Sequence, residues 1–387
     1  MTDSEAHYRK MTETPVSRLI LNLGIPTTIS MLITSIYNMA DTYFVGTLGE
    51  SAQAATGILF TVQAIMQGLA FMLGHGAGTH VSRSLADRDA DKATMYISTS
   101  FFTGMGLGLV IGVLGLAFLR PLVHFLGSTD TIAPYAMDYI RVILLGAPYM
   151  TASLVLNNLL RFQGNAFYGM LGLTSGGILN IVLDPILIFG CRLGISGAAW
   201  ATIISQLVGF LILFYQCNHA GIVKIRLRNV RISGALYRKI VNGGLPSLLR
   251  QGVASLATIC LNLAAKPYGD AAIAAMAIVS RIANFTNSVI IGFGQGFQPV
   301  CGYNYGARLY GRVRQGFWFC VQFSTVFLVL ISAVELVLAP GFVELFRKGD
   351  PQVVEIGARA LRLQCLTFPF FGWLIISNMM MQTMGKA

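Results

Sequence analysis

Long runs of apolar residues, separated by short polar segments, follow one another along the whole chain. We place ten such runs, at about 17–45, 52–82, 95–119, 133–160, 167–190, 195–217, 237–265, 270–300, 314–340 and 353–381. Each is longer than the roughly 18 residues that identify a membrane-spanning helix. Lipid offers the backbone no hydrogen-bond partners, and these runs are far too long for barrel strands, so each must be helical. The pattern predicts an all-α polytopic membrane protein.

The composition argues against a water-soluble protein. Charged residues make up 11% of the 387 residues, against about 25% in an ordinary soluble domain, and 55% of the residues are hydrophobic. So few charges cannot cover the surface of a soluble chain of this length. The six cysteines form no CxxC pair, so we interpret them as small core residues rather than disulfides or metal ligands; they are Cys191, Cys217, Cys260, Cys301, Cys320 and Cys365.

Basic residues are distributed unequally between the two sides of the membrane. With the N-terminus in the cytoplasm, 17 of the 27 Lys and Arg residues, Arg161 among them, fall on the cytoplasmic side and eight fall outside. Positive charge gathers on the cytoplasmic side of membrane proteins, so this excess predicts a cytoplasmic N-terminus. The basic stretch 224–239 is then a cytoplasmic linker near acidic lipid head groups, and a nucleic-acid-binding arm is the weaker alternative.

The two halves of the chain resemble each other. A shift of 220 residues, with one extra residue late in the repeat, pairs residues of like type: Gly24 with Gly244, Pro26 with Pro246, Gly74 with Gly294, Gly76 with Gly296, Arg88 with Arg308, Arg141 with Arg362, and Pro148 with Pro369. Six spans separate the halves, so both start on the same side of the membrane. This predicts a parallel repeat about an axis normal to the membrane, one of the known transporter plans.

The repeat also predicts how the chain is divided. We expect a first lobe at 1–220 with six spans, a cytoplasmic basic linker at 221–236, and a second lobe at 237–387 with four spans. The first half continues through two more spans after Ala166, whereas the sequence ends at the equivalent residue, Ala387. We therefore expect twelve spans in the natural protein, with the last two absent from this chain.

Ionisable residues inside lipid are costly, so each is a functional candidate. Only three of the 16 carboxylates lie clearly within predicted spans: Asp41, Asp184 and Glu335. Glu335 is near the exterior end of its span, which favours an interfacial position. Asp41 and Asp184 each follow a polar residue by one helical turn, Tyr37 and Asn180, so each pair shares a helix face.

Topology places several polar groups of the first half at similar depth. Two spans run outward and reach Asp41 and Asp184 in their outer parts, while the spans at 133–160 and 195–217 run inward and meet Tyr139, Thr202 and Gln206 early. We predict a polar cluster there; unrelated interhelical hydrogen bonds are the alternative. In the second half, Asp41 pairs with Leu261, and the candidates for a cavity are cationic or neutral: Arg250, Gln251, Arg281 and Asn284. Arg250 and Arg281 are equally compatible with a structural role.

Two prolines interrupt backbone hydrogen bonding next to these groups. Pro26 leaves the carbonyl of Asn22 without its helical donor, and Pro185 does the same for Ile181. A hinged helix that carries a buried carboxylate suits an ion-coupled switch, although ordinary proline kinks are common in membrane helices.

Several strings in the chain are similar to a known family: NMADTYFVG, NIVLDPILI followed by GAAWAT, and QPVCGYNYGA. The chain resembles the multidrug and toxic compound extrusion (MATE) transporters, of the bacterial branch that includes MepA-like and DinF-like proteins. The resemblance implies two six-helix lobes around a cavity that opens alternately to either side, and cation-coupled efflux of amphipathic, often cationic compounds. It also implies a site for Na⁺ or H⁺ at Asp41, Asn180, Asp184 and Thr202, with Tyr37 and Tyr139 beside it and Pro26 as a hinge.

Other functions remain as alternatives. A flippase for lipid-linked sugars from the same superfamily is the closest of them. Arg250 and Arg281 are compatible with it, because such flippases often carry basic residues in the cavity. A membrane enzyme or electron carrier would need histidines at ligand spacing, but the five histidines lie near span ends or outside; no phosphate loop points to an ATP-driven pump. We therefore expect no enzyme activity, no cofactor beyond the coupling ion and no nucleic acid. We expect a monomer in the bacterial inner membrane that transports small amphipathic or cationic drugs.

Overall fold

The structure, a computed structural model, describes residues 3–219, 223–346 and 351–386, and these residues are almost entirely helical. The first part of the chain forms α1 (Asp3–Glu13), α2 (Val16–Gly46), α3 (Glu50–Ala86), α4 (Ala90–Ala117), α5 (Leu119–Phe125), α6 (Ala133–Phe162), α7 (Ala166–Pro185) and α8 (Ile195–His219). The second part forms α9 (Gly234–Ala265), α10 (Asp270–Gly306), α11 (Tyr310–Phe346), α12 (Pro351–Cys365) and α13 (Phe368–Met384). A π-helix, Ile186–Gly190, continues α7.

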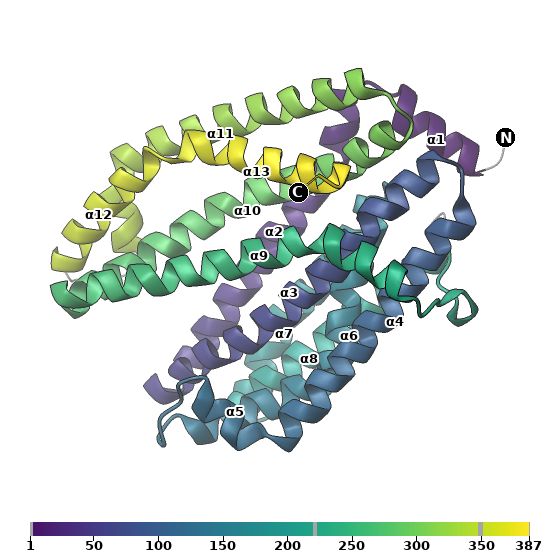
Figure 1. Cartoon of the computed structure of the whole chain (residues 1–387). Coiled ribbons are helices and arrows are strands. Elements are labelled where there is room, and N and C mark those ends of the chain that lie inside the picture. The colour runs from purple at the N-terminus through teal and green to yellow at the C-terminus, as the bar shows by residue number, and fades with distance from the viewer. Residues whose placement is uncertain (1–2, 220–222, 347–350, 387) are drawn as a thin grey trace.

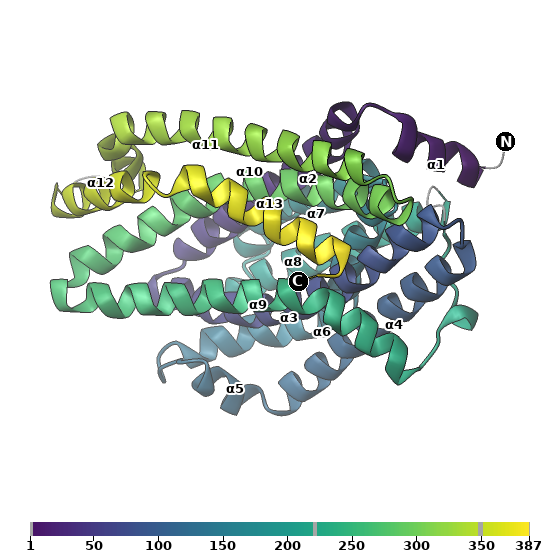
Figure 2. The same cartoon turned by 45° about the horizontal axis from the view of Figure 1, so that its top comes forward.

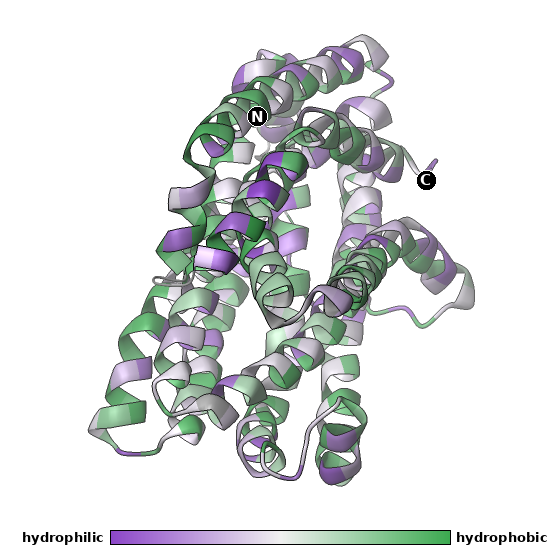
Figure 3. Cartoon of the chain, turned by 90° about the vertical axis from the view of Figure 1, so that its left-hand side faces the viewer, coloured by the Kyte–Doolittle hydropathy of each residue, from purple (hydrophilic) through white to green (hydrophobic). Residues whose placement is uncertain are grey.

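The predicted number of spans is confirmed. Within the described ranges, nine helices are long and apolar enough to cross a membrane, and α12 and α13 together make a tenth, bent by 54° where they meet. Their outer faces carry exposed apolar side chains at helical spacing, such as Val110 and Val113 on α4, and Val326, Leu330 and Val337 on α11. Figure 3 shows that apolar residues occur along most of the helices. These faces are suited to contact with lipid acyl chains.

The helices form two arms that meet at one end. Helices α2–α8 make the first arm and α9–α13 the second, and Figure 1 shows them diverging from a common end near the N-terminus. The short helix α5 and helix α12 lie at the far ends of the two arms and are well separated in Figures 1 and 2. The chain is therefore V-shaped, and it is closed on the side where α1 lies.

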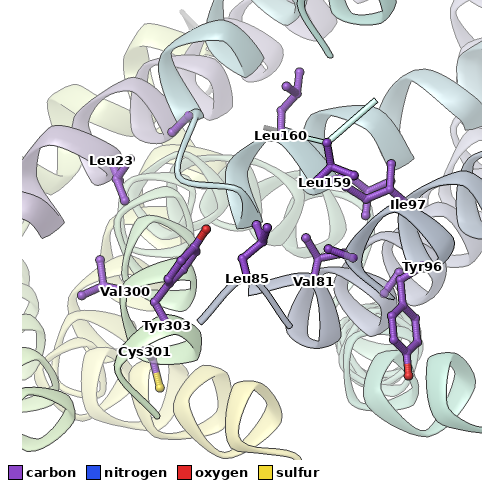
Figure 4. Packing of buried hydrophobic residues seen from close by; sticks show 14 of the residues in the cluster. Leu23, Val81, Leu85, Tyr96, Ile97, Leu159, Leu160, Val300, Cys301 and Tyr303 are labelled. Carbon is purple, nitrogen blue, oxygen red and sulfur yellow. The ribbon is translucent and has the colours of Figure 1, made fainter. Parts of the chain in front are cut away.

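The buried apolar residues are divided in the same way. One cluster takes residues from both arms, with Leu23 and Leu85 from the first arm and Val300 and Tyr303 from the second (Figure 4). Away from this end the cores are separate: one cluster lies wholly in the first arm, and two lie wholly in the second. The arms thus share a core only at the closed end.

Glycines allow the helices of the two arms to touch backbone to backbone at the closed end. A Cβ atom at Gly76 of α3 would lie 1.9 Å from the carbonyl oxygen of Ile240 in α9, and one at Gly244 of α9 would lie 1.8 Å from that of Met72. A Cβ atom at Gly296 of α10 would lie 2.3 Å from the Cα of Gly24 in α2. Small residues permit such close approach of membrane helices. We call these contacts the glycine seam.

The seam has the symmetry of the sequence repeat. The shift of 220 residues pairs Gly24 with Gly244 and Gly76 with Gly296. The contact of α2 with α10 and that of α3 with α9 are therefore equivalent by the repeat, and the same glycine positions build both.

Helix α1, which was not predicted from the apolar pattern, packs under the closed end and contacts both arms. Its Met11 is fully buried, and the His7 ring lies 5.5 Å from the ring of Tyr303 in α10. A Cβ atom at Gly164, just after α6, would lie 3.0 Å from the His7 ring. Asn304 of α10 donates a hydrogen bond to the carbonyl oxygen of Met11 at 3.2 Å.

We expect the docking of α1 to weaken in acid. Burial, and then the charge of Lys10, lower the pKa of His7 to about 4 from its usual 6.5. Between those pH values the undocked helix binds more protons than the docked one, so docking weakens as pH falls from about 6.5 to about 4. Limited proteolysis at Arg9 and Lys10 across this range should show increasing cleavage, and His7→Phe should show a flat profile. The same rise in cleavage in both proteins would contradict this role of His7.

The glycine seam makes a second prediction. Gly244→Ala should force α9 away from α3, whereas Gly252→Ala on the same helix meets nothing within 4 Å and serves as the control. Both substitutions improve helix propensity by about 1 kcal/mol, so the comparison isolates the clash. Spin labels at positions 125 and 355 measure the distance between the far ends of the arms. A population with a shorter distance between the two labels should appear only in Gly244→Ala. Identical distance distributions in the two variants would mean that the seam does not hold this state.

Candidate functional site

The polar residues predicted to cluster in the first half do lie together. Asp41 comes from the C-terminal part of α2 and Tyr139 from the start of α6. Asn180 and Asp184 lie one turn apart on α7, and Thr202 faces them from α8. All five are buried, with exposed fractions of 5% or less. We call them the acidic site.

Hydrogen bonds join the members of the acidic site in two groups, one between α2 and α6 and the other between α7 and α8. The Tyr139 hydroxyl lies 2.9 Å from both carboxylate oxygens of Asp41, to which it donates. The side-chain amide of Asn180 donates to Oδ1 of Asp184 at 3.2 Å and to the hydroxyl of Thr202 at 3.4 Å. Asp41 and Asp184 are close enough to interact electrostatically.

The acidic site holds more acceptors than donors. Two of its buried oxygens, Oδ1 of Asn180 and Oδ2 of Asp184, have no hydrogen-bond partner among the described residues. A buried polar atom without a partner is costly, and a buried carboxylate without a counter-charge more so. Oxygen atoms of carboxylates, amides and hydroxyls are the ligands that hard cations prefer, and carboxylates also take up protons. The donor set therefore fits either a proton or a small hard cation.

Tyr37 and Gln206 lie beside the acidic site and are only partly buried. The amide of Gln206 on α8 lies 3.5 Å from the hydroxyl of Tyr37 on α2, to which it donates. Gly177 on α7 lets α2 approach here, since a Cβ atom at that position would lie 3.2 Å from the Tyr37 ring. This pair links α2 to α8 next to the acidic site.

The backbone near the site is irregular where proline was expected to disturb it. The α-helical part of α7 ends at Pro185, directly after Asp184, and five residues of π-helix follow. Single turns of π-helix are frequent at functional sites. Helix α2, in contrast, runs without a break through Pro26, so a hinge there stays a prediction.

The second-half candidates are not brought together into a site. Arg281 and Asn284 on α10 are exposed, and Gln251 on α9 is only partly buried. Arg250 is half-buried, and its Nη1 has no partner among the described residues. Their role in a cavity stays a prediction.

Glu335, which was expected at the membrane interface, is buried between helices. Its side chain is 3% exposed and lies inside the second arm, where Thr286 of α10 donates to one carboxylate oxygen at 3.1 Å. The thiol of Cys365, at the bend between α12 and α13, donates to the other at 3.3 Å. Position along the span suggested the interface, but neighbouring helices cover this residue.

Arg161, which was counted as a cytoplasmic charge, lies at the closed end but does not reach the surface. It is 2% exposed and lies between the arms. Its guanidinium donates across the arms to Oε1 of Gln295 in α10, and within the first arm to Asn158 at 2.6 Å and to Nε2 of His75 at 2.8 Å. His75, which was placed near a span end, is 1% exposed inside α3.

His75 connects Arg161 to the second arm by a further hydrogen bond. Arginine only donates, so Nε2 of His75 accepts and its Nδ1 donates to the hydroxyl of Ser247 on α9 at 2.8 Å. Gln382 of α13 in turn donates to Ser247 at 2.7 Å and to the carbonyl oxygen of Gly243 at 3.0 Å. We call this network the polar knot; it consists of Arg161, His75, Gln295, Ser247 and Gln382.

The sequence did contain a signal for the polar knot. The repeat pairs His75 with Gln295 at a shift of 220 residues, and Arg161 with Gln382 at a shift of 221. Two polar residues recurring at equivalent depth in both halves indicate a shared polar contact on the pseudo-twofold axis. Counting charges by side of the membrane did not detect it.

Comparisons with known proteins agree with this geometry. The chain is similar to the multidrug export protein MepA of Staphylococcus aureus, with 29% identity over 390 residues, 100% of this chain and 85% of that protein. MepA of Staphylococcus haemolyticus is 27% identical over 388 residues, with the same coverage. A solved structure of a multidrug resistance MATE family transporter of the MOP superfamily, in an outward-facing conformation, has a TM-score of 0.92 and 28% identity, covering 100% of this chain and 86% of that one.

A family match covers most of the chain. Residues 26–186 and 246–387, one stretch from each half, match the MatE family. The matched ranges contain the acidic site except Thr202, and all five residues of the polar knot. Of the four seam glycines they contain Gly76 and Gly296. On this evidence the chain belongs to the MatE family of membrane transporters.

Proposed function

We propose that this transporter is a secondary active multidrug exporter that exchanges H⁺ or Na⁺ for amphipathic or cationic compounds. The observation that carries the proposal is the acidic site, which holds two buried carboxylates and two unpartnered oxygens in a membrane-embedded arm. Ionisable groups inside a membrane mark ion pathways and proton relays. The likeness to MepA, a multidrug export protein, supports the substrate class.

The V shape supports alternating access. The arms share a core at the closed end and diverge toward α5 and α12 (Figure 1), which fits a cycle in which a compound held between them would reach only the side opposite the N-terminus. With the N-terminus in the cytoplasm, as the basic residues predict, that side is the exterior. The likeness to a transporter solved in an outward-facing conformation supports this assignment.

The acidic site can drive the cycle because an ion bound there changes the charge of the first arm. An entering cation or proton relieves the mutual repulsion of Asp41 and Asp184, and the arm is then free to adopt a packing that the charged pair disfavours. A membrane potential adds roughly 2.3 kcal/mol per charge per 100 mV if the ion crosses the full field. Differential binding of the ion to the two states sets the direction of transport.

Removing either carboxylate should uncouple transport. We expect Asp41→Asn and Asp184→Asn to fold, to bind a cationic dye such as ethidium, and to lose gradient-driven efflux by at least tenfold in vesicles. Asp138→Asn, an exposed carboxylate on α6 next to Tyr139, is the control and should transport like the parent. Parental rates in both site variants, under imposed pH and Na⁺ gradients, would place the coupling site elsewhere. Lipid-linked precursors that accumulate on deletion, without any change in dye efflux, would favour the flippase alternative.

The Tyr139 hydroxyl should matter through its two bonds to Asp41. Tyr139→Phe keeps the ring but leaves the buried carboxylate without this donor, so uptake of the coupling ion should begin at a lower ion concentration while maximal transport falls. Tyr135→Phe, one turn earlier on α6 and 42% exposed, is the matched control. The ion concentration at half-maximal efflux, measured in vesicles, tests this. An unchanged half-maximal concentration in Tyr139→Phe would show that the bond has no role in coupling.

A further inference from the structure

A basic groove lies across the two arms at the closed end. It is a cavity of about 410 Å³ whose lining includes His80 and Arg83 from the last turns of α3, Lys239, Asn242 and Leu245 from the start of α9, and Gln382 from the end of α13. We call it the basic groove. It belongs to neither the acidic site nor the polar knot, although Gln382 also takes part in the knot.

Helix α1 covers the counterpart of this groove in the repeat. The repeat pairs Arg83 with Tyr303, and Gly385 at the edge of the groove with Gly164. Tyr303 and Gly164 are the residues against which the His7 ring of α1 packs. The groove is therefore the position at which a second α1 would dock.

The segment that precedes α9 does not take that position. It crosses α4 instead, where the backbone N–H groups of Arg226 and Arg231 donate to the hydroxyls of Ser98 and Thr99, both at 3.1 Å. In the part of the chain that the structure describes, no helix equivalent to α1 fills the basic groove.

The groove differs from its counterpart in charge. The repeat pairs His80 with Val300, Arg83 with Tyr303 and Lys239 with Leu19, so the positive charges of Arg83 and Lys239 stand where the α1-covered side has uncharged residues. No carboxylate is among the lining residues. Asp87, four residues after Arg83, is near enough to attract it, but the two form no ion pair within 4 Å in the described ranges. The groove is thus suited to an anion.

Hydrogen bonds hold Arg83 and His80 in position and leave the terminal N–H groups of Arg83 without a partner among the described residues. Nε of Arg83 donates to the carbonyl oxygen of Thr79 at 3.0 Å, while its two terminal nitrogens have no hydrogen-bond partner among the described residues and face Gly385, where a Cβ would lie 3.3 Å from Nη1. The His80 ring stacks on Tyr96 at 4.8 Å and donates to the backbone carbonyl of Lys239. His80 thereby ties α3 to α9 at the groove.

We propose that the basic groove binds the phosphate of an anionic phospholipid head group, such as phosphatidylglycerol, and that the lipid clamps the closed end. A guanidinium matches phosphate in a bidentate manner, a lysine adds a second charge, and Leu245 and Pro246 give an apolar wall beside them. Basic pockets between spanning helices on the cytoplasmic side are typical sites for such head groups. A volume of about 410 Å³ is within the range of small-molecule sites.

Clamping follows from the placement of the charges. Arg83 belongs to the first arm and Lys239 to the second, so a phosphate that contacts both is held only while the arms meet. A ligand that binds one state alone stabilises that state by mass action. The binding part of this inference is independent of the proposed transport function, whereas the clamping part rests on the arms separating during transport.

Binding is tested without transport, on the purified full chain in neutral detergent. Phosphatidylglycerol should raise the thermal unfolding midpoint, and phosphatidylcholine should not. Lys239→Gln and Arg83→Gln should each weaken the phosphatidylglycerol response at least tenfold in concentration. Arg238→Gln removes the same charge from an exposed neighbour outside the lining and should respond like the parent. Lys239 is exposed, so its variant tests the groove even if Arg83→Gln folds poorly.

Three results would overturn the proposal. An equal response to phosphatidylglycerol in all variants would place the lipid elsewhere, and no response in the parent would show that the groove does not bind it. An equal effect of millimolar inorganic phosphate would assign the groove to a free anion instead of a lipid. Spin labels at positions 125 and 355 test the clamp separately: phosphatidylglycerol should enrich the wide separation in the parent and Arg238→Gln but not in Lys239→Gln. If phosphatidylglycerol binds but does not enrich the wide separation, the clamping part of the proposal is wrong and the binding part stands.

Discussion

Close backbone contact between the arms is the constraint on which the rest of this structure depends. Lipid acyl chains are as apolar as leucine, so two membrane helices gain little hydrophobic free energy by meeting and associate through packing and hydrogen bonds. At Gly76 and Gly244 a single added carbon would enter the opposing backbone. The contact lies at one end of the arms, and the far ends carry separate cores. The V shape follows from this arrangement, and the basic groove lies where the arms meet.

The polar knot fixes how the helices of the two arms are aligned at the closed end. Glycine contacts alone would allow these helices to shift along each other. Hydrogen bonds in a low-dielectric interior are strong, and a buried group that loses its partner is costly. Arg161 is buried without a carboxylate partner in the described part of the chain, and its bond to Gln295 joins the arms. His75 accepts from Arg161 and so is neutral in this state. Separating the arms would leave Arg161 without its partner in α10, a loss that water entering between the arms would offset.

The sequence predicted the spans because their apolar runs do not depend on neighbours, and it placed Asp41 with Asp184 because each follows a polar residue by one turn in a span of known direction. It did not predict burial that other helices supply. Arg161 lies at the end of a span, where a charge ordinarily reaches the lipid surface, yet α3 and α10 cover it. Glu335 is near a predicted span end, but it is covered by α10 and by the bend after Cys365. Helix α1 is short and polar, so no apolar run marked it.

Helix α2 connects the acidic site with the glycine seam, so in the proposed antiport cycle it is the element that would link ion binding to the arms. It carries Asp41 near one end and Gly24 near the other, about 26 Å apart at 1.5 Å per residue. Because the helix is continuous, a shift at Asp41 reaches the seam only if α2 moves or bends. Pro26 lies two residues from Gly24, where the missing N–H leaves the helix one hydrogen bond short. A bend there would lift Gly24 from Gly296 while the outer part of α2 stays packed in the first arm. The second arm has the same proline at Pro246 but no acid on α9 in the described residues, so in the proposed cycle the ion would act on one arm and the seam would transmit its effect to the other.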